Sequence, residues 1–318
     1  MIGVVAGLTA LVVAGWIAFV PSPSEPPYEF VGAWGEKGGA PGQFDDPTGI
    51  AVAGREVFVA DSRNGRIQIF DLDGRFERML GAPGDEPGEL GRPMNITVHD
   101  GELYVPEYFN DRIQVFEPDG TSKRIIGRAG RGPGGFNAPV GVAVAPNGDL
   151  FVADFYGQRV QQLEPDGTFV RQWGTTGQTS HAAGEFYYPT DVALDRAGRL
   201  YVADGYGHRI QVFDPSGAHL RSWGGPFARG VYGPFPGWLS TVTAIAVGPE
   251  GDLFVADFYN DRIQKFAPDG TFLTRFGEPG AGAGQLHHPI GVAVAEDGSV
   301  FVTDFLNHRI QKWQSPGG

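Results

Sequence analysis

The chain has 318 residues, a length that suits one large all-β domain or two smaller ones. Its 24 basic and 37 acidic residues give a net charge of −13, which repels a phosphate backbone and argues against nucleic-acid binding. The absence of cysteine excludes disulfides, thiolate catalysis and cysteine-ligated metals.

The first segment, residues 1–20, reads MIGVVAGLTALVVAGWIAFV and contains no charged side chain. Twenty helical residues rise about 30 Å, roughly the hydrocarbon thickness of a bilayer. A cleaved signal peptide normally has a basic start, a shorter apolar run and a small-residue cleavage site, and this segment lacks all three. We therefore predict a transmembrane anchor, or an uncleaved signal, at 1–20; a cleaved signal peptide is the alternative.

Residues 21–27, PSPSEPP, cannot continue a helix and are predicted to form a short, stiff linker. Neither flank of the anchor carries a nearby Lys or Arg, so charge does not set its orientation. The usual outcome for a single N-terminal anchor places the following domain on the periplasmic or extracellular side of the membrane.

After the linker, a fourteen-residue pattern recurs six times without gaps. The arginines of successive copies are 46 to 53 residues apart, a period typical of closed or stacked arrays of supersecondary units. The copies are VFVADSRNGRIQIF (57–70), LYVPEYFNDRIQVF (103–116), LFVADFYGQRVQQL (150–163), LYVADGYGHRIQVF (200–213), LFVADFYNDRIQKF (253–266) and VFVTDFLNHRIQKW (300–313).

Each repeat is predicted to contain four strands separated by Gly- and Pro-rich turns. A short strand such as GVAVA (141–145) precedes the LFVAD strand, the RIQxF strand follows it, and a segment such as FVRQWG (169–174) forms the fourth. The sixth repeat lacks this fourth strand, whereas YEFVGAWG (28–35) stands alone at the start and resembles one. We therefore predict a ring whose last blade is closed by the N-terminal strand, which removes exposed sheet edges.

The elements P-x-G-[IV]-A-V, LFVAD and N-[DH]-R-I-Q-x-F resemble the NHL repeat, with six copies across residues 28–314. The resemblance implies an all-β, six-bladed β-propeller with four-stranded blades, followed by a tail at 315–318. The second copy departs from the pattern at Pro106 and Glu107, and Gly157 and Gly207 replace the Asn, without threatening the fold.

An acidic residue precedes the repeat arginine by five positions in every copy. The two residues flank one connection, so an ion pair with bidentate geometry is expected. We interpret these pairs as structural, because a ligand site would use residues that break the repeat symmetry. The pairs are Asp61/Arg66, Glu107/Arg112, Asp154/Arg159, Asp204/Arg209, Asp257/Arg262 and Asp304/Arg309.

Strand direction sorts the loops onto two faces. One face carries short, uniform turns, whereas the other carries the connections between second and third strands and the loops between blades, so function is expected on the latter. The longest interblade loop, GGPFARGVYGPFPGWLSTV (224–242), is rich in aromatic residues. A protein-contact surface is predicted there, with folding back onto the propeller as the alternative; its residues are Phe227, Tyr232, Phe235 and Trp238.

A second candidate site lies at the mouth of the central channel, where the repeats differ in polar residues. One set of residues lies directly before the leading proline of each blade, and in the fifth repeat this residue is Ser240 or Thr241. The other set lies two residues after that proline, where other repeats have Gly. The resulting candidate ligand site consists of Asp46, Arg92, Asn95, Tyr188, Asp191 and His288.

Related six-bladed propellers include metal-dependent lactonases and lyases, whose sites need clustered His or carboxylate ligands. The histidines on the variable face are His181, His287 and His288, and the adjacent pair is expected to diverge, so a three-His zinc site is not evident. A calcium site from Asp46, Asp191 and backbone carbonyls is the remaining metal option, and no cofactor is otherwise expected.

The sequence therefore favours a membrane-anchored, non-catalytic scaffold that binds a protein partner or helps to assemble a membrane complex. The alternative is a metal-dependent propeller enzyme of the lyase or lactonase type, with its site at the channel mouth. RNA binding, known for some NHL domains, is disfavoured by the acidic charge and the anchor.

Overall fold

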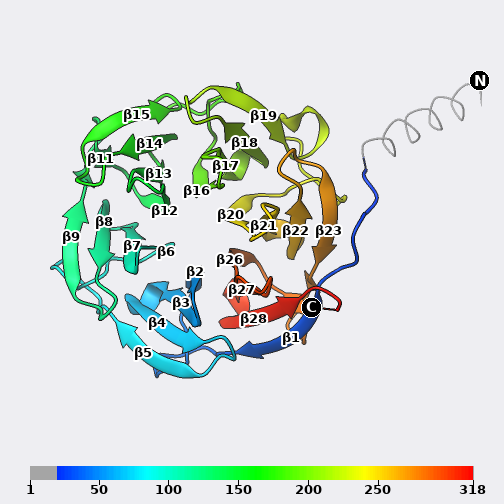
Figure 1. Cartoon of the computed structure of the whole chain (residues 1–318), viewed down its shortest axis with the longest axis horizontal. Coiled ribbons are helices and arrows are strands. Elements are labelled where there is room, and N and C mark those ends of the chain that lie inside the picture. Colours follow the sequence, from blue (N-terminus) through cyan, green and yellow to red (C-terminus); the bar gives the residue numbers. More distant parts are fainter. Residues whose placement is uncertain (1–19, 318) are drawn as a thin grey trace, which may run out of the picture.

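Each repeat forms one four-stranded antiparallel sheet in the computed structural model, which describes residues 20–317. The six sheets are blades arranged around a central channel, with the first strand of each repeat innermost (Figure 1). The six-bladed, all-β prediction is therefore confirmed.

The strands follow the predicted order in every blade. The innermost strands are β2 (Pro47–Ala53), β6 (Thr97–His99), β12 (Pro139–Val144), β16 (Pro189–Leu194), β20 (Val242–Val247) and β26 (Pro289–Val294). The second strands are β3 (Glu56–Asp61), β7 (Glu102–Glu107), β13 (Leu150–Asp154), β17 (Leu200–Asp204), β21 (Leu253–Asp257) and β27 (Val300–Asp304). The third strands are β4 (Arg66–Asp71), β8 (Arg112–Phe116), β14 (Arg159–Leu163), β18 (Arg209–Phe213), β22 (Arg262–Phe266) and β28 (Arg309–Gln314).

The outermost strands form the rim of the ring. They are β5 (Phe76–Leu80), β9 (Ser122–Ile126), β15 (Phe169–Trp173), β19 (His219–Trp223), β23 (Phe272–Phe276) and β1 (Glu29–Trp34). Two interblade loops also contain short parallel pairs, β10 (Arg128–Ala129) with β11 (Gly135–Phe136) and β24 (Glu278–Pro279) with β25 (Gln285–Leu286).

The N-terminal strand β1 closes the sixth blade by pairing antiparallel with β28. The register places Glu29 opposite Gln314 and Trp34 opposite Ile310. The first and last parts of the propeller thus share one sheet, as predicted, and the ring has no open end.

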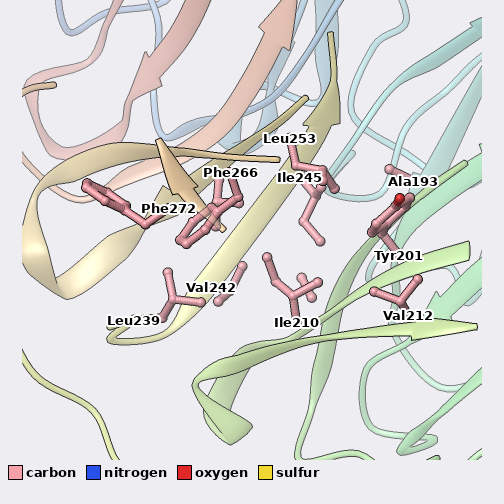
Figure 2. Close-up of a cluster of buried hydrophobic side chains, with 12 residues drawn as sticks. Ala193, Tyr201, Ile210, Val212, Leu239, Val242, Ile245, Leu253, Phe266 and Phe272 are labelled. Carbon is pink, nitrogen blue, oxygen red and sulfur yellow. The ribbon is translucent and has the colours of Figure 1, made fainter. Parts of the chain in front are cut away.

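The hydrophobic core lies between neighbouring blades. Second and third strands such as β13 and β14 are buried along their whole length, because a blade packs on both of their faces. Figure 2 shows one such layer, in which Tyr201 and Ile210 of the fourth blade meet Ile245 and Phe266 of the fifth. Outer strands such as β9 alternate between exposed and part-buried residues over most of their length, since one side faces solvent.

The second blade is the least regular. Its inner strand β6 has three residues, whereas β12 has six. Pro106 in the facing strand has no N–H to donate to the ladder, so regular pairing between β6 and β7 begins only at Thr97. The departure at Pro106 shortens the strand without removing the blade.

Within residues 20–317 there is no helix long and apolar enough to cross a membrane. The predicted anchor at 1–20 lies outside the described residues, apart from Val20.

Candidate functional site

A cavity of about 360 Å³ occupies the channel mouth on the face that carries the connections between second and third strands. All six blades contribute to its wall. The polar part of the wall comes from the starts of the innermost strands, with Asn95, Thr190, Thr241 and Thr243. The aromatic part comes from the connections, with Tyr108, Phe155, Tyr156, Tyr206, Phe258 and Tyr259.

An apolar crown surrounds this cavity. Each connection has four residues between the acidic residue and the arginine, of which the third is Asn in four blades and donates to the acidic residue of the repeat, as Asn260 does to Asp257 at 2.8 Å. The second residue of the connection is left exposed. The crown consists of Phe109, Tyr156, Tyr206, Tyr259 and Leu306, and the first blade has Arg63 at this position.

The aromatic rings of the crown and cavity contact one another across blades. Tyr108 and Tyr156 are 6.0 Å apart, and Tyr188 links Phe155 at 4.8 Å to Tyr206 at 5.5 Å. Burial raises the pKa of Tyr108, and its hydrogen bond with Tyr156 raises it further. Burial likewise raises the pKa of Tyr206. The phenols of Tyr108 and Tyr206 therefore remain neutral at physiological pH and can both donate and accept hydrogen bonds.

At the polar wall of the cavity, Asn95 reaches Asp191 and so bridges the second and fourth blades. Asn95 Nδ2 donates to Asp191 Oδ1 at 2.7 Å, and the backbone N–H of Ile245 donates to Oδ2 at 2.9 Å. Burial raises the pKa of Asp191 to about 7, because the side chain has no cationic partner and the residue is only 2% exposed. The carboxylate passes over Gly141 of the intervening blade, where a Cβ would lie 2.6 Å from Oδ1.

The other predicted mouth residues take different places. Arg92 lies over the rings of Tyr108 and Phe109 at 5.7 and 5.5 Å, Tyr188 joins the aromatic contacts described above, and His288 stacks on Phe258 at 4.4 Å. Of the six predicted residues, Asn95 alone lines the cavity itself, and Asp46 forms an ion pair with Arg63 at 2.8 Å. The structure therefore joins Asn95 to Asp191, places Arg92, Tyr188 and His288 against the aromatic wall, and leaves Asp46 apart.

The position before the leading proline has a left-handed backbone in every blade. The values of φ lie between 53° and 62°, which identifies Thr241 rather than Ser240 as the equivalent residue in the fifth blade. The N–H of this residue donates to a side chain from the preceding blade where that side chain has an acceptor, as Ala138 does to Asp111 at 2.6 Å. This position is thus a hydrogen-bonded corner between blades. The residues are Asp46, Arg92, Ala138, Tyr188, Thr241 and His288.

All six acid–arginine pairs are present, with distances from 2.6 to 2.8 Å between arginine Nε and the carboxylate. The expected bidentate geometry is wrong, because the remaining guanidinium nitrogens donate to carbonyl groups of the interblade loop. Arg262, for example, donates to Pro234 O, Phe235 O and Trp238 O. The second carboxylate oxygen accepts a loop N–H, as Asp257 does from Ser240 at 2.6 Å. Each pair therefore fastens an interblade loop to its blade.

The expected metal ligands do not gather as predicted. Within residues 20–317, the group that could hold a metal is Asp45, Asp46 and His308, and it does not include Asp191. The rings of His287 and His288 lie 4.9 Å apart, so the expectation that they diverge is wrong, while His181 stacks on Tyr187. A calcium site that joins Asp46 to Asp191 is not formed.

The interblade loop predicted at 224–242 ends at Thr241, because β20 begins at Val242, and 224–241 is here called the aromatic loop. Only some of its predicted contact residues are exposed. Phe227, Tyr232 and Phe235 are exposed, but Trp238 is 3% exposed and packs against Phe235 at 5.0 Å. Trp238 therefore follows the alternative of folding back onto the propeller, and its backbone carbonyl group accepts hydrogen bonds from Arg262 and Gln264.

The sequence interpretation missed the crown. The signal was present, because five of the six connections carry Phe, Tyr or Leu between the acidic residue and the arginine, in a segment too short to bury every side chain. The repeat symmetry concealed it, since the whole fourteen-residue pattern was interpreted as structural.

The family model described as NHL repeat matches residues 44–70, 136–163, 186–213, 239–266 and 286–313. These segments run from the end of an interblade loop to the end of a third strand in five of the six blades. The second blade, with Pro106 and the short strand β6, is not matched.

Similar proteins share parts of the sequence or the overall fold. The protein named "brain tumor" of Drosophila melanogaster is 51% identical over 49 residues, which are 15% of this chain and 5% of that protein. A solved streptogramin B lyase covers 92% of this chain and all of its own, with a TM-score of 0.61 and 16% identity. A Bacteroides thetaiotaomicron structure of unknown function covers 90% of this chain and 75% of its own, with a TM-score of 0.68 and 14% identity.

Proposed function

Because the chain is a six-bladed β-propeller that carries NHL repeats, we propose that it is a membrane-anchored, non-catalytic scaffold that binds a protein partner through its crown face. The observation that carries the proposal is the crown itself, a set of exposed apolar side chains around a cavity on the face where the repeats differ. Isolated exposed hydrophobic residues are ordinary on a protein surface, whereas a contiguous patch marks an interaction site.

The chemistry of the crown suits a protein partner. Tyrosine and phenylalanine are enriched at the centres of protein interfaces, where the ring is buried and a phenol can still form a hydrogen bond. Arg92 over Tyr108 and Arg63 beside Asp46 provide a polar rim. The cavity between the rings has room for one or two side chains of the partner.

The membrane part of the proposal is supported by the sequence of residues 1–20, which is apolar, uncharged and long enough to span a bilayer. In this proposal the propeller lies on the non-cytoplasmic side and helps to assemble a membrane complex.

A metal-dependent reaction is the second candidate function, and one observation favours it: Asp45, Asp46 and His308 offer three ligand atoms within 4.8 Å of one another. Arg63 stands against it, because its guanidinium already pairs with Asp46 and would repel a divalent cation.

The scaffold proposal is tested by comparing two variants of the full chain in mild-detergent pull-downs read by mass spectrometry. One variant carries Tyr156→Ser, Tyr206→Ser and Tyr259→Ser in the crown. The matched control carries Ile125→Ser, Val170→Ser and Val31→Ser, which are exposed on the outer strands β9, β15 and β1.

We expect the crown variant to lose partners that the wild type and the control both retain, with circular dichroism showing that all three are folded. Identical partner sets for the crown variant and the wild type would refute the crown as the contact. Stoichiometric metal in the purified wild-type protein would instead favour the enzyme.

A further inference from the structure

The linker before the first strand is attached to the rim of the fifth blade. The N–H groups of Ser24 and Glu25 donate to Leu273 O at 2.9 and 3.1 Å, and Glu25 pairs with Lys265 at 2.7 Å. Tyr28 then stacks on Phe276 with 5.0 Å between ring centroids. The predicted stiff linker at 21–27 is therefore a segment bound along β23, and it cannot swing freely.

The linker reaches the aromatic loop at its N-terminal end. A Cβ at Gly237 would lie 2.9 Å from Pro21 Cγ and 3.7 Å from Phe272 Cβ, so Pro21 packs directly on this glycine. Figure 1 shows the linker, in dark blue, on the same side of the ring as the loop between β19 and β20. The described part of the chain, which begins at Val20, therefore starts beside the aromatic loop.

The aromatic loop has the composition of a membrane-interface segment. It contains no carboxylate, and Arg229 is its one charged residue, although the protein as a whole has a net charge of −13. Val231, Tyr232 and Phe235 are exposed, and Pro234 between them is exposed as well. Aromatic side chains beside a cationic one are typical of the headgroup region of a bilayer.

We propose that the aromatic loop rests in the headgroup region of the same bilayer that holds residues 1–20, so that the rim of the fourth and fifth blades faces the membrane. This inference rests on the proposed membrane anchor. If the spanning segment ends near Val20, the bilayer surface lies within a few residues of Pro21, and each residue extends the chain by about 3.5 Å at most. Gly237, two residues beyond Phe235, is therefore held close to that surface.

The proposal assigns the loop to lipid, whereas the sequence alone suggested a protein contact. Because Pro21 packs on Gly237, the loop lies close to the bilayer surface whether or not a protein partner is bound. The same placement leaves the crown of the second and third blades, with Phe109 and Tyr156, on the part of the ring away from the membrane.

The absence of cysteine allows a direct test in the full chain. Tyr232→Cys and Phe235→Cys are labelled with the environment-sensitive fluorophore NBD, and the protein is reconstituted into phosphatidylcholine nanodiscs with or without lipids that carry a nitroxide quencher on the headgroup. The matched control is Phe109→Cys, because Phe109 and Tyr232 are both 64% exposed, and Val170→Cys on the third blade is a second control. Circular dichroism confirms that each labelled protein is folded.

We expect the nitroxide lipid to reduce fluorescence about two-fold or more at positions 232 and 235, and to leave positions 109 and 170 unchanged. If the protein stays in the nanodiscs but none of the four labels is quenched, or all four are quenched equally, the loop inference is overturned and the anchor stands. If the protein does not remain in the nanodiscs, the proposed anchor fails, and the inference fails with it.

Discussion

Asn95 and Asp191, which are 96 residues apart in the chain, form a 2.7 Å hydrogen bond between the second and fourth blades at the polar wall of the channel-mouth cavity. The contact combines two departures from the repeat, because the equivalent position is Gly in the first, third and sixth blades. The carboxyl group of Asp191 is also fully buried at this contact and has no cationic partner.

The raised pKa of Asp191 predicts a pH-dependent contribution to stability. The pKa rises from 3.8 when unfolded to about 7 when folded, so the folded protein binds the proton more tightly and this residue destabilises the fold as pH rises through that interval. Three pKa units correspond to about 4 kcal/mol as an upper bound. Asp191→Asn should therefore gain stability relative to wild type between pH 4 and 7, as measured by urea unfolding at a series of pH values. A constant difference between the two proteins across this range would contradict the burial of a neutral carboxyl group.

Gly141 should tolerate no side chain, because Asp191 passes over it. A Cβ there would lie 2.6 Å from Asp191 Oδ1 and 2.7 Å from Asp191 Cα, and the backbone atom cannot rotate away. We expect Gly141→Ala to lower the free energy of unfolding by about 1–3 kcal/mol. Gly132→Ala is the matched control, since a Cβ there has nothing within 4 Å, and its effect should be within about 0.5 kcal/mol. Equal effects of the two substitutions in urea unfolding would refute the close approach.

Removal of the acidic residue of a buried acid–arginine pair should lower the free energy of unfolding. Asp257→Ala leaves the Arg262 guanidinium and the Ser240 N–H without their acceptor inside the blade. The expected loss is about 3–5 kcal/mol, measured by chemical unfolding. Asp257→Asn, which keeps an acceptor for the N–H, should lose less. The control Arg75→Ala removes an exposed ion pair with Asp71 and should leave stability nearly unchanged. A loss of stability for Arg75→Ala as large as that for Asp257→Ala would show that burial does not increase the contribution of the Asp257–Arg262 pair.

Calcium should not stabilise the wild-type protein, because the Asp46 carboxylate already forms an ion pair with Arg63, whose positive charge repels a cation. A ligand that binds only the folded state raises the melting temperature by mass action, so the measurement is the melting temperature with excess calcium against that with EDTA. We expect no difference. A clear rise with calcium would instead establish Asp45, Asp46 and His308 as a cation site and revive the enzymatic alternative.

Much of the fold could be predicted because its determinants are local and repeated. The fourteen-residue pattern contains the second and third strands to within one residue at each end, and its acidic residue and arginine sit on facing ends of one hairpin. The isolated fourth strand at the N-terminus indicated the closing pair β1–β28, since a strand without a partner in its own repeat must pair elsewhere. The channel-mouth site was predicted less completely: Asn95 and Asp191 meet, but Asp46 turns to Arg63.

The sequence by itself determined the number of blades, their order and the closure of the ring, because these depend on periodicity and on pairing between neighbours in the chain. The tertiary structure alone decided which side chains meet at the axis, that Trp238 is buried while Tyr232 is exposed, and that Pro21 lies on Gly237. Those contacts join residues from different blades, or from the linker and a distant loop. Their distances depend on how all the blades are placed around the ring, and no local pattern records that placement.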